Sequence, residues 1–92
     1  MPALSGQKNV TTAGTAVALG SQPIGGPLSV KALAANTGVV VIGNDGAGDI
    51  TANGFQLSAG EVIVFNHVAN LANIIVDAAV NGEGVCWLAL DI

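Results

Sequence analysis

The sequence predicts an all-β protein, a small β-sandwich or jelly-roll-like barrel of about eight short strands. Apolar residues occur in short runs rich in valine and isoleucine, which is typical of strands. Thirteen glycines, some of them beside asparagine or proline, interrupt these runs and can supply the positive φ angles of tight turns. The short, regular spacing of the runs favours a sandwich over alternating strands and helices.

The first half of the chain contains four candidate strands. They cover Lys8 to Thr12, Thr15 to Leu19, Leu28 to Ala34 and Val39 to Gly43. The breaks between them are Ala13-Gly14, Gly25-Gly26-Pro27 and Asn36-Thr37-Gly38. The alanine-rich third run resembles a helix, but proline before it and glycine after it leave room for only about two turns. An isolated helix that short is marginal, so a strand is expected there.

Four further strands are expected in the second half. They cover Phe55 to Leu57, Glu61 to His67, Ile74 to Asp77 and Val85 to Leu90. Turn signals precede most of them, at Asn44-Asp45-Gly46, Asn53-Gly54 and Asn81-Gly82.

Two of the expected strands are apolar at every position, Val39 to Ile42 and Val62 to Phe65. Such strands are covered on both faces. One face meets the opposite sheet. In so small a chain the other face is expected to meet a second subunit, although loops of the same chain can also cover part of a central strand. The composition agrees, because 51% of the residues are hydrophobic and only 9% are charged, against about 25% charged in an average domain. We therefore expect a homo-oligomer.

The domain organisation expected from the sequence is a flexible N-terminal arm over residues 1–7, followed by a single β-sandwich domain over residues 8–92. Pro2, Ala3 and Leu4 make the arm apolar, so it is expected to order on binding and to contact a partner. Its deletion is expected to leave the fold intact and to weaken assembly.

Charge excludes two classes of partner. Lys8 and Lys31 are the only basic residues and the net charge is −4, so the chain has few groups to neutralise phosphates or anionic lipids. We expect neither nucleic-acid nor membrane binding. No apolar stretch is long enough to span a bilayer, and the N-terminus lacks the pattern of a signal peptide, so the chain is expected to stay in the cytoplasm where it is made.

The sequence contains no catalytic pattern. His67 is the only histidine, no serine has a nucleophile-elbow setting, and Cys86 lies in an apolar run where a buried, inert thiol is expected. The loop with Asp45 and Asp49 offers oxygen ligands but not the spacing of a calcium-binding loop, and Gly46-x-Gly48 is an incomplete nucleotide-binding pattern. We expect no enzyme activity, no cofactor and no metal.

Four segments together resemble a known family. They are Val10 to Val17, Asn36 to Gly43, Asn53 to Glu61 and Asn70 to Asp77. In its order of strands and turns the chain is similar to the small β-rich virion proteins of tailed phages, among which are capsid cement or decoration proteins. The resemblance implies a trimer or other small oligomer on the capsid exterior that bridges and stabilises major capsid protein subunits.

Two other functions are open. A neck, tail or fibre protein would have the same composition and a lower copy number. A carbohydrate-binding sandwich would need exposed aromatic faces; Phe65 and Trp87 are expected to be buried, so Phe55 is the aromatic residue to test as a partner contact.

Overall fold

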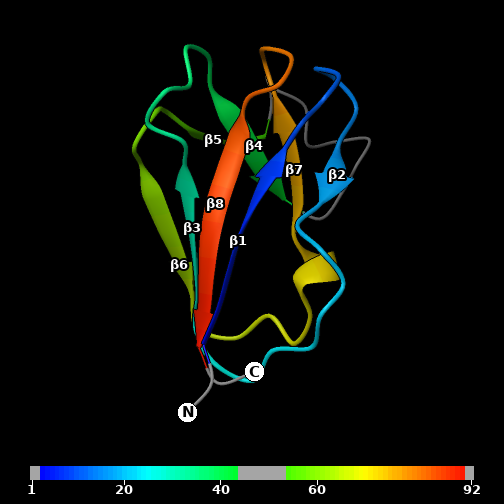
Figure 1. Ribbon diagram of the computed structural model, residues 1–92, viewed down its shortest axis with the longest axis vertical. Coiled ribbons are helices and arrows are strands. Elements are labelled where there is room, and N and C mark those ends of the chain that lie inside the picture. Colours follow the sequence, from blue (N-terminus) through cyan, green and yellow to red (C-terminus); the bar gives the residue numbers. More distant parts are fainter. Residues whose placement is uncertain (1–2, 44–53, 91–92) are drawn as a thin grey trace.

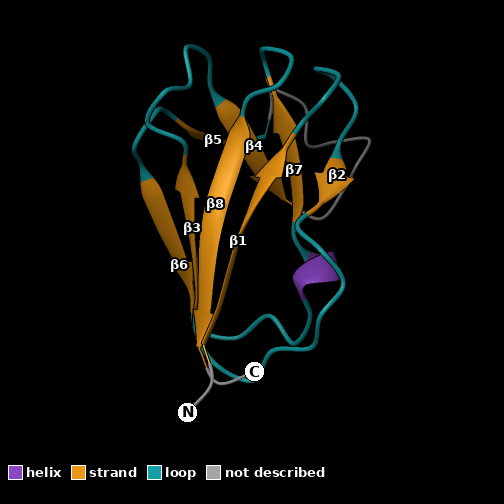
Figure 2. Cartoon of the chain, in the orientation of Figure 1, coloured by secondary structure: helices purple, strands orange, loops and turns teal. Residues whose placement is uncertain are grey.

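The computed structural model describes residues 3–43 and 54–90, and within them the chain forms eight strands and one short 3-10 helix. Figures 1 and 2 show two layers of strands with loops gathered at both ends. The elements are β1 (Ala3–Asn9), β2 (Val17–Ala18), β3 (Leu28–Ala32), β4 (Val40–Gly43), β5 (Phe55–Leu57), β6 (Val62–Phe65), η1 (Leu71–Asn73), β7 (Ile75–Ala78) and β8 (Gly84–Leu90). The predicted small all-β sandwich is confirmed.

The strands are connected as in a jelly roll. The pairing is nested and antiparallel: β1 pairs with β8, β2 with β7, β3 with β6, and β4 with β5. Ladders between β3 and β8 and between β4 and β7 join these pairs into two four-stranded sheets. Sheet A has the order β1-β8-β3-β6 and sheet B the order β2-β7-β4-β5. Each sheet therefore combines strands from the beginning, middle and end of the chain.

The first strand begins at Ala3, earlier than the predicted start at Lys8. Residues 3–9 pair one to one with residues 84–90 of β8, so residues 3–7, expected to form an arm, make up most of the outer strand of sheet A. Their sequence did not indicate a strand because the glycine and polar residues between Leu4 and Lys8 have low or neutral β propensity. They become a strand because β8 offers a full row of backbone partners.

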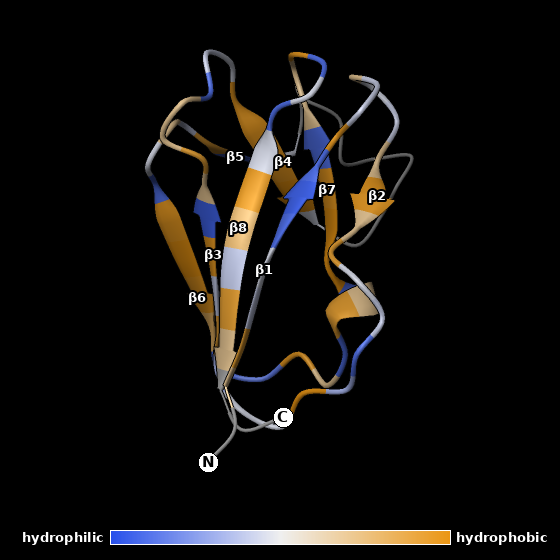
Figure 3. Cartoon of the chain, in the orientation of Figure 1, coloured by the Kyte–Doolittle hydropathy of each residue, from blue (hydrophilic) through white to orange (hydrophobic). Residues whose placement is uncertain are grey.

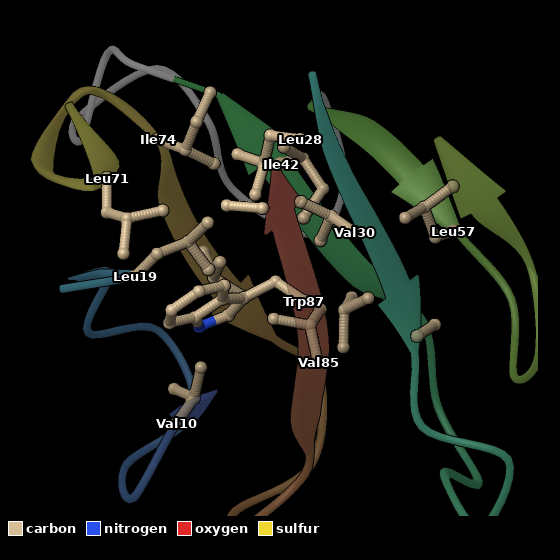
Figure 4. Packing of buried hydrophobic residues seen from close by; sticks show 14 of the residues in the cluster. Val10, Leu19, Leu28, Val30, Ile42, Leu57, Leu71, Ile74, Val85 and Trp87 are labelled. Atoms are coloured by element: carbon tan, nitrogen blue, oxygen red, sulfur yellow. The ribbon is translucent and has the colours of Figure 1, made fainter. Parts of the chain in front are cut away.

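Alternate residues of facing strands form the core between the sheets. The inward residues of the two central strands of sheet A are buried: Leu28, Val30 and Ala32 of β3, and Val85, Trp87 and Ala89 of β8. Figure 4 shows the Trp87 ring pointing into this core together with Val85 of the same strand. Leu4 packs against it from β1, which ties the first strand to the sandwich through a side chain as well as through the backbone.

A chain lacking residues 1–7 is expected to be less stable than the full chain. The deletion removes most of the β1–β8 ladder and the Leu4 side chain, and a loss of about 1 kcal/mol lowers the unfolding midpoint of a domain this size by roughly 4–8 °C. Thermal unfolding followed by circular dichroism measures the change, with a chain lacking only residues 1–2 as the control. If the chain lacking residues 1–7 unfolds at the same temperature as the full chain, residues 1–7 are a dispensable arm after all.

Candidate interaction surface

The outer face of sheet A is built from two rows of side chains that cross all four strands. Cross-strand register places Ser5, Leu88, Ser29 and Val64 in one row and Gln7, Cys86, Lys31 and Val62 in the other. Because successive residues of a strand point to opposite faces, these eight side chains lie on the side away from the core. We call these two rows the outer face of sheet A.

Large apolar side chains on this face are open to solvent. Val62, Val64 and Leu88 are 53%, 59% and 47% exposed, although each belongs to a regular strand. An open hollow of about 610 Å³ lies over the rows and is lined by seven of their eight residues together with Gly6 and Trp87. Val62 and Val64 lie together on β6, and Leu88 lies between Ser5 and Ser29 in its row. Exposed apolar side chains gathered on one sheet face are a feature of contact surfaces.

Charge on this face is limited to one side chain. Lys31 is exposed and stands opposite Val62 on β6 and Cys86 on β8, and neither row contains a carboxylate. A partner that covers the face therefore has to place a carboxylate or a carbonyl oxygen near Lys31, or leave its ammonium group at the solvent-exposed rim.

The outer face of sheet B differs, because two side chains at its centre are already covered. Val41 and Asp77 are cross-strand neighbours that point away from the core cluster, yet they are only 1% and 2% exposed. The Asp77 carboxylate accepts hydrogen bonds from the backbone N–H groups of Gly14 (3.0 Å) and Ala78 (2.8 Å). Of the two all-apolar strands in the sequence, β4 is thus covered on both faces within the chain, while β6 leaves its outward valines exposed.

Most of the residues singled out from the sequence lie elsewhere. Pro2 is outside the described residues, Ala3 is exposed at the start of β1, and Leu4 points toward the core. Phe55 is 58% exposed on β5, the outer strand of sheet B, and does not line the hollow. Ala3, Leu4 and Phe55 do not form one surface. The sequence showed that Val62 and Val64 are apolar, but which face of β6 stays uncovered depends on the packing of the sheets.

The residues considered for chemistry are separated. His67 is exposed in the loop after β6, and the Asp45 and Asp49 loop lies outside the described residues. Cys86 was expected in the core but is half-buried on the outer face of sheet A, because the core positions of β8 are Val85, Trp87 and Ala89. Trp87 is buried as expected, and its indole Nε1 has no hydrogen-bond partner among the described residues. Phe65 is only half-buried, packed against the core.

A polar clasp at one end of the sandwich joins the β3–β4 loop to the β7–β8 turn. Glu83 Oε2 accepts from the backbone N–H (2.6 Å) and hydroxyl (3.0 Å) of Thr37, and Oε1 accepts from the N–H of Gly38 (2.9 Å). The buried Asn36 amide donates to the carbonyl of Gly84 (2.8 Å) beside it. Donation by Gly38 and Thr37 holds the pKa of Glu83 below the ordinary value of a glutamate carboxyl. Both carboxylate oxygens are used within the fold, so the clasp is structural.

Comparison of the chain with protein-family models, with curated proteins and with solved structures finds no match. Within residues 3–43 and 54–90, no three His, Cys, Asp or Glu side chains are grouped so that they could hold a metal ion. No helix in the same part of the chain is long and apolar enough to cross a membrane.

Replacing Glu83 by glutamine is expected to destabilise the chain at neutral pH and to do so less in acid. The pKa of the Glu83 carboxyl is lower in the folded chain than in the unfolded chain, so the ionised carboxylate stabilises the fold at neutral pH. This stabilisation is lost as the pH falls through the pKa that Glu83 has in the folded chain. Thermal unfolding of both chains from pH 7 downward measures the effect, and the two midpoints should converge in acid. A difference that stays constant with pH would show that the charge of Glu83 does not carry the effect.

Proposed function

We propose that this protein is a structural component of a virus particle that acts by binding alone, with the outer face of sheet A as its contact surface. More specifically, we propose a capsid cement protein of a tailed phage, which sits on the capsid exterior as a small oligomer and bridges major capsid protein subunits. The observation that carries the proposal is an open sheet face with three exposed apolar side chains, Val62, Val64 and Leu88, on a chain with few charges.

Burial of such a face can hold the protein on a partner surface. Burial of apolar surface contributes about 25 cal/mol per Å², and Val62, Val64 and Leu88 expose area that a partner can cover. With one lysine and no carboxylate in the rows, this contact depends little on ion pairs and is expected to persist at high salt. A shell presents the same site many times, so an oligomer that engages several sites at once gains avidity without any new type of contact.

A neck, tail or fibre location uses the same face and the same physics. The two locations differ in copy number, because a cement protein covers the lattice while a neck or tail protein forms a few rings or spikes. Quantitative mass spectrometry of gradient-purified particles separates them. A copy number comparable to that of the major capsid protein supports the cement role, and absence from the particles contradicts any virion role.

Carbohydrate binding is supported by one residue. Phe55 is the single aromatic side chain classed as exposed among residues 3–43 and 54–90, since Phe65 is half-buried and Trp87 is buried. Stacking on a sugar uses such an exposed ring, but Phe55 lies away from the hollow over sheet A. If no glycan in a panel binds the chain in a way that is lost when Phe55 is replaced by alanine, carbohydrate binding is ruled out.

Leu88→Lys is expected to reduce the amount of protein bound to capsids by about tenfold or more, which corresponds to a loss of about 1.4 kcal/mol. The substitution places a charge at the centre of the face, next to Ser5 and Ser29 in its row. Co-sedimentation with particles that lack the protein measures binding. Val80→Lys is the matched control, because Val80 is also an exposed apolar residue (39%) but lies in the β7–β8 turn. Equal binding of both variants would show that the face is not the contact.

A further inference from the structure

The two sheets have four outer strands, and these differ in how well their free edges are protected. The outer strands are β1 and β6 in sheet A and β2 and β5 in sheet B. A free edge presents unpaired backbone N–H and C=O groups to any extended chain, and proteins commonly protect it with short strands, charged residues or bulges.

Three of the four edges carry such a feature. Strand β2 has two residues and β5 has three. Strand β1 is longer, but Lys8 lies on its half-buried side with Leu4 and Gly6, and an inward-pointing charge disfavours pairing with another strand. Figure 3 shows the contrast within sheet A: β6 is hydrophobic along its whole length, while the arrowhead end of β1, its C-terminal end, is hydrophilic.

Strand β6 is only one residue longer than β5, but its residues Val62 to Phe65 include no charged residue, no proline and no bulge. Its four residues are Val-Ile-Val-Phe. The preceding Glu61 lies outside residues 62–65, and its carboxylate accepts a hydrogen bond of 2.6 Å from the Ser58 backbone N–H in the turn before β6. Gly60 has a positive φ of 84°, typical of a bulge, but it lies before the strand and leaves residues 62–65 in regular register with β3.

The register determines which backbone groups face the free edge. Ala32 donates to the carbonyl of Glu61 (2.9 Å) and accepts from the N–H of Gly60 (3.0 Å), so Gly60 and Glu61 together oppose Ala32 in a bulge, and the Glu61 carbonyl points toward β3. Hydrogen-bonded and non-hydrogen-bonded pairs alternate along an antiparallel ladder, so Ile63 and Phe65 bond to β3, and the N–H and C=O groups of Val62 and Val64 point away from it. Within residues 3–43 and 54–90 no strand pairs with this side of β6, so Val62 and Val64, the valines of the outer face, also carry the unpaired backbone groups of the edge.

We propose that β6 pairs antiparallel with β6 of a second copy of this chain, so that the two sheets A form one continuous sheet. The segment is self-complementary about a twofold axis at Ile63. Val62 of one copy then forms a hydrogen-bonded pair with Val64 of the other, and the two Ile63 residues face each other as a non-hydrogen-bonded pair. Valine meets valine on the outer side, and Glu61 stands opposite Phe65 of the other copy, so no like charges are opposed.

This pairing rests on the edge of β6 and does not depend on a role in a virion. It places the outer faces of both copies on the same side of the joined sheet, because antiparallel pairing in this register keeps each row on its own face. A partner surface would then meet two hollows and two Lys31 side chains at once.

A cysteine cross-link tests the proposed register. In the Cys86→Ser background, Ile63→Cys places two thiols at a non-hydrogen-bonded pair, where Cα atoms are about 4.5 Å apart, within disulfide range. Mild oxidation should convert most of this variant to a covalent dimer, while Val80→Cys in the same background should remain largely monomeric. Equal cross-linking of the two variants would overturn the register.

The unmodified chain provides a second test that does not depend on the cysteine variant folding. Light scattering after size exclusion should show a dimer that Val64→Pro converts to monomer, because the Val64 N–H faces the free edge and proline is tolerated there. Hydrogen exchange at the Val62 and Val64 amides should slow as protein concentration rises. A chain that stays monomeric at every concentration would overturn the proposal. So would a dimer that Leu88→Lys dissociates and Val64→Pro does not, because the copies would then meet through the sheet face.

Discussion

Strand β8 is the element on which the rest of the structure depends. It pairs with β1 on one side and β3 on the other, and so joins the two ends of the chain to its middle. Its odd-numbered residues from Val85 to Ala89 fill the core, and its even-numbered residues Cys86 and Leu88 lie on the outer face of sheet A. At Gly84, the first residue of the strand, a side chain would overlap the backbone carbonyl of Lys8. The approach of β1 thus requires glycine at this position.

The asymmetry between the two outer faces connects the fold to the proposed function. Both sheets contain an all-apolar strand, but the outward side chain of Val41 is buried within the chain, whereas those of Val62 and Val64 are open. A free monomer keeps these valines in contact with water, and association removes that unfavourable contact. Because the chain has few charges, ion pairs contribute little to the choice of partner. Selectivity then depends on the shape of the outer face of sheet A and on the backbone hydrogen-bonding groups of the β6 edge.

Strand β6 belongs both to the outer face of sheet A and to the free edge of that sheet. The face and the edge can bind different partners at the same time. Backbone hydrogen bonds across an edge favour an extended strand of fixed direction, while an apolar face accepts any surface of matching shape. Joining two copies through the edge leaves both faces free for a larger partner. An assembly built in this way would be strengthened by repetition, which suits a protein that binds a lattice.

Much of the fold could be predicted from short-range features of the sequence. The valine-rich runs and the glycine-bearing turns are local, and they located seven of the strands closely, as at Phe55–Leu57, where prediction and structure coincide. The first strand was largely missed, because Ser5, Gly6 and Gln7 have no strong preference of their own and extend only when β8 pairs with them. The inward face of β8 was likewise not evident, which is why Cys86 was expected in the core.

The sequence by itself determined that this is a small all-β chain with few charges and with two strands that are apolar at successive positions. Only the tertiary structure decided which surface remains uncovered. Alternation places Val62 and Val64 on one face and Ile63 on the other, but the nested pairing puts β6 at the edge of sheet A and covers β4 within sheet B. A one-residue change of register would exchange the faces of a strand, and that register is set by long-range pairing that no local pattern encodes.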